Sequence, residues 1–348
     1  VLLLLASLPV SAHAAVWDIG KGNITVNAGS GGQTVTQGSQ VDVPDSAPVI
    51  TGNSTENTVT INAEKDQTAN VTLSDVNIDV KNEGKAAVST NGEGNVSIEL
   101  DGENTLRSAN NHAGLEKNNG GSLTIADEDK NGKLTAEGGI YGAGIGGGYE
   151  GEGSNIAITG GEVEATGGIG GAGIGGGKNG AGSSIAITGG EVKATGGKYG
   201  AGVGGDLSGN GNHITITGGE VKATGGLNGA GIGGGLWGKG KDITISGDAQ
   251  LKVQGGVGDY FDGPGAGIGD GGSRPKESTG GNPIPGAEVE PDTSGLTTNG
   301  SIEYYAPGAD MEKDKPEKTT VGTLPPQEKP VEPIEPAEPE QPEAERGM

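Results

Sequence analysis

The chain has no cysteine, and aromatic residues make up only 3% of its 348 positions. Without cysteine there is no disulfide framework and no thiol chemistry. With so few large side chains, the chain lacks the bulk to fill the wide core of an ordinary globular domain. After the first residues, no stretch approaches the ~20 apolar residues of a membrane-spanning helix. The composition therefore excludes a disulfide-stabilised fold, a later membrane span and an ordinary rounded domain.

Positive charge is also scarce. The chain carries 22 Lys and Arg against 46 Asp and Glu, for a formal net charge of -24. A strongly acidic chain repels phosphate backbones and anionic headgroups, so we expect neither nucleic acid nor a membrane surface as its partner. Cations and uncharged partners remain.

Glycine is abundant, with 75 residues, and it recurs with a fixed period. A Gly-Ala-Gly triplet begins at Gly142, Gly171, Gly200 and Gly229, in steps of 29 residues. Four copies without an insertion between them are typical of a solenoid, in which each copy forms one turn of a spiral.

Each copy contains three strand-like segments, at residues 143–146, 155–159 and 162–166 of the first one. Side chains alternate along a strand. The set expected to point inward is apolar throughout: Ala143, Ile145, Ile156, Ile158, Val163 and Ala165. Parallel strands joined by crossovers are almost always right-handed. We therefore predict an all-β protein, a right-handed parallel β-helix with three-sided coils of about 29 residues.

The less regular first half shows the same alternation with looser turns. Aligning the second strand of each turn places Leu73, Ile98, Ile125 and Ile158 in one column, with spacings of 25, 27 and 33 residues before the period of 29 begins. We expect these residues to stack inside the β-helix.

The domain organisation follows from these patterns. An apolar run with a small-x-small site at Ala12 and Ala14 predicts a signal peptide at residues 1–14, and hence a secreted or cell-surface protein. The remaining segments are a cap or first strands, the β-helix, an irregular Gly/Pro-rich segment and a disordered Pro/Glu tail, at residues 15–46, 47–272, 273–323 and 324–348 respectively.

Aromatic residues gather at the turns of the repeats. Tyr141 and Tyr199 hold the same repeat position, and an insertion at that corner contributes Tyr260 and Phe261. Trp237 belongs to a different corner of the coil. Flat rings beside polar side chains are suited to stack on sugars, so these five residues are the candidate carbohydrate-binding residues. The alternative is that each ring packs on its own turn.

Residues 127–132 read Asp-Glu-Asp-Lys-Asn-Gly, the first half of a calcium-binding loop. Oxygen ligands stand at alternate positions, so Asp127, Asp129 and Asn131 are the candidate ligands for Ca2+. The acidic residue expected at position twelve is missing, and a solvated turn between two strands is the alternative interpretation.

Charged residues also repeat along the third strand. Glu162, Glu191 and Glu220 are expected to form one column, and Lys193, Lys222 and Lys252 form another two residues further along. Carboxylates stacked about 4.8 Å apart repel one another. The lysines offer internal neutralisation, so we expect an exposed charge ladder, with bound cations as the alternative.

No catalytic residues can be assembled from the sequence. His112 and His213 lie in different coils and at different repeat positions, and neither has a nucleophile at motif spacing. We therefore expect a protein that is not an enzyme.

Several segments together suggest a family. These are Trp17–Thr25, the run PVITGNSTENTVTI at 48–61, ANVTLSDVNIDV at 69–80 and the tandem GAGIGGG and ITGGEVKATGG motifs. Over residues 17–272 the chain resembles the carbohydrate-binding β-helix domains of secreted and surface proteins of anaerobic Gram-positive bacteria, which are similar in fold to polysaccharide lyases. The resemblance implies a calcium-dependent binder of plant or microbial polysaccharide, and we expect it to be a monomer. A structural adhesin or spacer without a glycan ligand, and a polysaccharide lyase, are the competing hypotheses.

Overall fold

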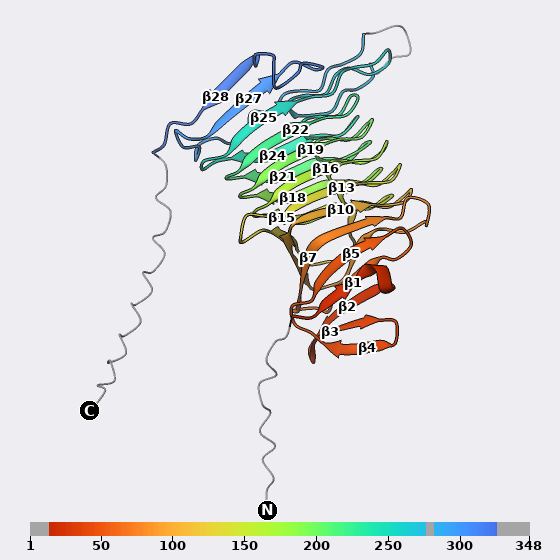
Figure 1. Cartoon of the computed structure of the whole chain (residues 1–348). Helices are drawn as coiled ribbons and strands as arrows, with labels where there is room; N and C mark the ends of the chain where they lie inside the picture. The colour runs from red at the N-terminus through yellow and green to blue at the C-terminus, as the bar shows by residue number, and fades with distance from the viewer. Residues whose placement is uncertain (1–13, 276–281, 326–348) are drawn as a thin grey trace, which may run out of the picture.

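The computed structural model describes residues 14–275 and 282–325 as an elongated stack of short strands (Figure 1). The predicted signal peptide, except for its last residue, and nearly all of the predicted Pro/Glu tail lie outside these ranges. The one helical segment within them is the 3-10 turn η1 (Ile19–Lys21), and no helix there is long and apolar enough to cross a membrane.

Two sheets of 17 and 11 strands build the three faces of each coil. The first face is the 11-stranded sheet. At its amino end, β3 (Gly32–Gln37) and β4 (Gln40–Pro44) lie beyond β2 (Ile24–Gly29) in the order of the sheet. Its parallel strands are β2, β6 (Val59–Ala63), β8 (Val88–Gly92), β11 (Leu115–Lys117), β14 (Ile145–Gly146), β17 (Ile174–Gly175), β20 (Val203–Gly204), β23 (Ile232–Gly233) and β26 (Ile268–Gly269).

The larger sheet forms the second and third faces, because β5 (Val49–Ser54) and β7 (Thr68–Asp79) each run from one face into the other. The second face continues through β1 (Val16–Asp18), β9 (Asn95–Asp101), β12 (Leu123–Ala126), β15 (Gly153–Ile158), β18 (Gly182–Ile187), β21 (Gly211–Ile216) and β24 (Gly240–Ile245). The third continues through β10 (Glu103–Arg107), β13 (Lys133–Glu137), β16 (Glu162–Thr166), β19 (Glu191–Thr195), β22 (Glu220–Thr224), β25 (Gln250–Gln254), β27 (Ser301–Tyr305) and β28 (Lys318–Val321).

The parallel register repeats the sequence period. Ile156 pairs with Ile185, which pairs with Ile214 and then Ile243, each one coil apart. All six side chains predicted to face inward in the first repeat are buried. The predicted fold class, a parallel β-helix, is therefore confirmed.

One predicted column is wrong at its first member. Ile98 pairs with Val71, whereas Leu73 pairs with Leu100. Side chains two residues apart share a face of the strand, and all four residues are apolar and buried. Alternation alone could not separate these two registers.

Antiparallel strands cover both ends of the stack. At the amino end β3 pairs antiparallel with β2, and β4 pairs with β3. At the carboxyl end β28 pairs antiparallel with β27. Parallel pairing extends from β1 to β27, which is further than the range 47–272 expected from the repeats. Because β27 is separated from β26 by a long irregular connection, periodicity did not reveal it.

Candidate functional site

Two turns of each repeat lie against each other and form a single edge of the solenoid. The first-face strands of these coils are only two residues long, so the turn before and the turn after this face come together. The N–H of Lys178 donates to the carbonyl of Tyr141 at 2.9 Å, and that of Leu236 donates to Tyr199 at 2.8 Å. We call the residues that line it the aromatic edge: Tyr141, Tyr149, Tyr199, Trp237, Tyr260 and Phe261.

Glycine permits this close stacking. Gly146 and Gly175 have φ of 132° and 133°, a region that favours glycine. A Cβ atom on Gly146 would lie 2.1 Å from the carbonyl oxygen of Gly175 in the next coil. The abundant glycines of the repeat are therefore a packing requirement, and the chemistry belongs to residues that differ between copies.

In the part of the aromatic edge nearer the amino end of the stack, a lysine lies over two tyrosine rings. The ring centroids of Tyr141 and Tyr149 lie 5.6 Å apart. The Lys178 ammonium lies 4.3 Å from the centroid of Tyr141 and 5.8 Å from that of Tyr149. Tyr141 precedes the first-face strand β14 and Tyr149 follows it, and the contact between the two turns brings both rings into the site.

In the part of the aromatic edge nearer the carboxyl end of the stack, Arg274 lies against two aromatic rings. Its guanidinium lies 5.4 Å from the ring of Trp237 and 5.4 Å from that of Phe261. Tyr260 packs edge-on against Phe261 at 5.1 Å. Tyr260 is 88% exposed, Phe261 60% and Trp237 44%. The structure thus brings Trp237 together with the insertion, although the two are at different corners in the repeat.

A buried carboxylate holds this group in place. Asp262 is 2% exposed, accepts a hydrogen bond of 2.9 Å from Trp237 Nε1 and pairs with Arg274 at 3.2 Å. Asn228 Nδ2 donates to the carbonyls of Asp262 and Gly263, each at 2.9 Å. The insertion therefore presents its aromatic side chains from an ordered loop.

Tyr199 lies between these two groups along the chain and carries the ammonium of Lys198 4.9 Å from its ring centroid. Five of the six rings of the aromatic edge thus have a cation within cation–π distance. Sequence reasoning missed these cations, although Lys198 directly precedes Tyr199 and Lys178 lies one period of 29 residues after Tyr149. The packing of the turns brings Lys178 to Tyr141, and Arg274 to Trp237 and Phe261.

The predicted calcium loop forms a carboxylate cluster with a residue from the coil below. Glu99, Asp127 and Asp129 place one oxygen each within 4.8 Å of one another. Burial raises the pKa of Glu99, and the neighbouring charges of Glu128, Asp127 and Asp129 add to this effect. Asn131, the third predicted ligand, makes a contact within the loop instead: its Nδ2 donates a hydrogen bond to Asp129 at 3.0 Å. The sequence missed Glu99, although the spacing of about one coil before Glu128 could have indicated it.

The two histidines of the described part lie apart, in different environments. His112 Nδ1 is 2.8 Å from Oε2 of the buried Glu116, and this contact raises the pKa of His112. His213 is exposed and lies 3.4 Å from Asp242. Next to Glu116, burial lowers the pKa of Lys117 to about 8, and its Nζ donates to the carbonyl of Asn119 at 2.7 Å.

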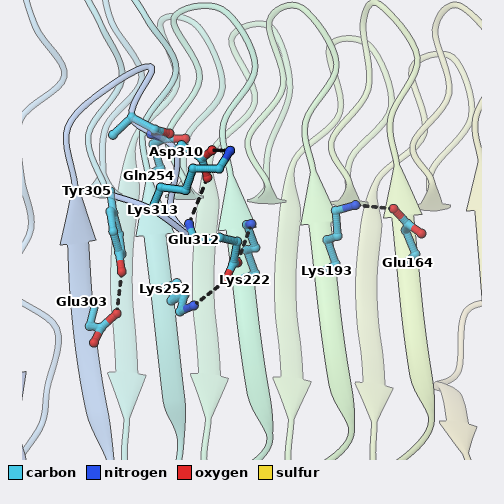
Figure 2. Close-up of polar contacts among 11 residues, drawn as sticks. Glu164, Lys193, Lys222, Lys252, Gln254, Glu303, Tyr305, Asp310, Glu312 and Lys313 are labelled. Atoms are coloured by element: carbon cyan, nitrogen blue, oxygen red, sulfur yellow. Dashed lines mark hydrogen bonds and ion pairs between the residues drawn. The ribbon is translucent and has the colours of Figure 1, made fainter. Parts of the chain in front are cut away.

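The third face carries the predicted column of Glu162, Glu191 and Glu220, which are in register. Lys193, Lys222 and Lys252 form the second column (Figure 2). Lys193 pairs with Glu164, and Lys222 and Lys252 both reach Glu312, at 2.9 and 3.0 Å. Glu312 belongs to residues 306–317, the segment between β27 and β28, which we call the strap. Its contacts border an open groove of about 370 Å³ on this face. Most of the lysine charge here is therefore neutralised within the protein.

Comparison with known proteins identifies the repeat. A family model described as "Beta helix repeat" matches residues 130–149, 156–178, 185–209 and 214–236. A search of curated proteins and a search of solved structures found no match to the chain. The family match agrees with the parallel β-helix and carries no information about a ligand.

Proposed function

We propose that the protein binds a polysaccharide of plant or microbial cell walls, outside the cell, and that the aromatic edge is its binding surface. One observation carries this proposal. The chain has 2 Trp, 6 Tyr and 1 Phe, and the three that lie off the aromatic edge, Trp17, Tyr304 and Tyr305, are all at least nine-tenths buried.

Exposed aromatic rings leave apolar surface in water, and a contiguous group of them marks a binding site more often than a packing need. Tyr260 and Phe261 on the ordered insertion, and Trp237 on the turn beside it, remain exposed although Arg274 lies against two of the rings. The carbon-bound hydrogens of a sugar ring pack on exposed aromatic faces. Coils stacked about 4.8 Å apart would place successive rings along a linear polymer.

The test is a glycan array probed with the protein and with a Tyr260→Ala/Phe261→Ala variant. We expect retention of at least one polysaccharide by the unmodified protein and loss of it in the variant. Ile169→Ala is the matched control, since Ile169 is 51% exposed and lies on a turn of the same repeats. Retention of no glycan would contradict the proposal and favour a structural spacer.

We further propose that Glu99, Asp127 and Asp129 bind Ca2+. The donors are all carboxylate oxygens, the ligands that this ion prefers, and they come together from two coils. Calcium would neutralise their mutual repulsion and so would stabilise the folded state by mass action.

The thermal midpoint should therefore rise when calcium is added and fall when it is chelated. Asp129→Asn should remove this dependence, because it deletes one of the three carboxylates. Glu128→Gln, in the same loop but outside the trio, should retain it. An equal response of both variants to chelator would contradict the assignment.

A polysaccharide lyase would release unsaturated products from pectin-like polymers. Ultraviolet absorbance of such a polymer incubated with the protein and calcium distinguishes binding from cleavage. We expect a flat trace.

A further inference from the structure

Asp206 interrupts a column of glycines next to the aromatic edge. The equivalent positions of the other repeats are Gly148, Gly177 and Gly235. There is no room for a side chain in this column: a Cβ atom on Gly177 would lie 2.0 Å from the carbonyl oxygen of Gly148. Asp206 nevertheless has 0% exposure, so its carboxyl group is held inside the turn.

Both carboxyl oxygens of Asp206 lack a hydrogen-bond partner in the described part of the chain. The backbone N–H groups of Leu207 and Asn179 are near enough to favour the ionised form, but neither completes a hydrogen bond. A buried ionised carboxylate without a partner is costly. Asp206 therefore either keeps its proton or, once ionised, must gain a compensating contact with a positive charge.

Asp206 packs on the turn that carries Lys178, because its N–H donates to the carbonyl of Gly180 at 3.2 Å. The positive charge of Lys178 favours the ionised form of Asp206 and so lowers its pKa against the effect of burial. Lys178 comes from the coil below, and its ammonium lies over the rings of Tyr141 and Tyr149. The other cations on the adjacent turns are engaged elsewhere: Lys198 lies over Tyr199, and Lys239 pairs with Asp270 at 2.7 Å.

We propose that Asp206 is a proton-operated switch for the aromatic edge: when its carboxyl group loses its proton, the buried negative charge draws the Lys178 ammonium away from the rings of Tyr141 and Tyr149. Lys178 is on a flexible side chain with no ion pair among the described residues, so it can move without breaking one.

The operating range is physiological. Burial raises the pKa of Asp206 to about 7. Below this pH the carboxyl group is neutral and Lys178 remains on the rings. Above it, the ionised carboxylate and the ammonium attract each other, and the outer faces of Tyr141 and Tyr149 are uncovered.

The consequence for ligand binding rests on the proposed function: uncovered rings can stack on sugar, so glycan retention should be severalfold stronger at pH 8 than at pH 5.5. The switch itself is measured without a glycan. The ring resonances of Tyr141 and Tyr149, assigned by Tyr→Phe variants of the full chain, should shift between pH 5 and pH 9 with a midpoint near 7.

Three variants isolate the cause. Asp206→Asn, a neutral residue of the same shape, and Asp206→Gly, which restores the residue of the repeat, should each abolish this shift. Lys178→Met should abolish it as well, since no cation is left to move. His112 and Lys117 titrate in the coil beneath Tyr149, and the Glu150 carboxylate beside Tyr149 raises the pKa of its hydroxyl group. Any shift that these three groups cause should persist in Asp206→Asn.

A flat titration of both rings in the unmodified chain, or an unchanged titration in Asp206→Asn, would overturn the switch. If the rings titrate as expected and no glycan is retained at any pH, the switch stands and the proposed function fails.

Discussion

Single residues of the repeat are constrained chiefly by the lack of space between coils. Gly175 has φ of 133°, and a Cβ atom there would lie 2.0 Å from the carbonyl oxygen of Gly204. That oxygen belongs to a strand paired on both sides, so it cannot move aside without breaking hydrogen bonds. The glycines thus determine how closely the coils of the aromatic edge can approach.

Gly175→Ala should therefore destabilise the protein by at least about 2 kcal/mol, because it adds both a steric clash and a strained backbone. Gly31→Ala is the control, since Gly31 has no heavy atom within 4 Å of an added Cβ and no positive φ. Urea denaturation of both variants measures the difference. Equal unfolding midpoints would show that the coils can separate to admit a methyl group.

The pairing of His112 with Glu116 predicts a pH dependence of stability. The hydrogen bond to Glu116 raises the pKa of His112 above the ordinary histidine value of 6.5. A group whose pKa is raised by folding stabilises the folded state fully below the unfolded pKa, and this contribution is lost as pH rises through the folded pKa.

The free energy of unfolding of the unmodified protein should therefore exceed that of His112→Gln at pH 5.5, by roughly 1 kcal/mol or less for a half-buried pair. The difference should shrink towards pH 9. Comparing the two proteins at each pH cancels the titrations of Asp206, whose raised pKa also lowers stability as pH rises, and of Lys117, whose lowered pKa acts in the opposite direction. A difference that grows with pH would contradict the assigned direction.

At the scale of elements, ion pairs hold the strap against the third face. Two lysines from neighbouring strands converge on Glu312, and their hydrogen bonds lower its pKa to about 2 (Figure 2). Gln254 Nε2 adds hydrogen bonds to the carbonyls of Ala306 and Ala309, at 2.6 and 2.9 Å. The ion pairs are exposed, so they are screened by salt.

Glu312→Gln should accelerate amide hydrogen exchange in residues 306–317 severalfold and leave the global unfolding midpoint unchanged. The reason is that the strap lies on the finished stack and does not form part of its core. Lys313→Met is the matched control, because Lys313 pairs only with Asp310 of the same strap. Equal exchange in the two variants would mean that the pair across the face does not anchor the strap.

The whole molecule behaves as a one-dimensional stack, in which each coil contacts only its neighbours. Its parallel registers join equivalent positions of successive copies, as Gly182 pairs with Gly211 and Gly153 with Gly182. A deletion of one complete period should therefore preserve every remaining register.

Removal of residues 171–199 should leave a folded protein with cooperative unfolding and a β-rich circular dichroism spectrum. Deletion of Ile185 alone should be more damaging, because a one-residue shift turns the rest of β18 to the opposite face. Thermal melts of the two proteins provide the comparison. Greater damage from the 29-residue deletion would contradict the description as a stack of equivalent coils.

The sequence by itself determined the coil. Its period placed Ile156 over Ile185, its alternation predicted the buried side chains, and its glycines marked the turns, because these features are local and repeat in every copy. Periodicity could not choose between registers two residues apart, as at Leu73, nor find β27, which follows an aperiodic connection.

Only the tertiary structure decided how the turns meet. It joined Trp237 to Phe261 through Arg274, placed Lys178 on Tyr141 and Tyr149, and brought Glu99 to Asp127 and Asp129. Trp237, Phe261 and Arg274 hold different repeat positions, so no spacing relates them. Lys178 lies one period of 29 residues from Tyr149, and Glu99 one period from Glu128, but the period alone does not say which side chains meet. Their proximity depends on the short first face, which folds two turns into one edge, and on the stacking of one coil upon the next.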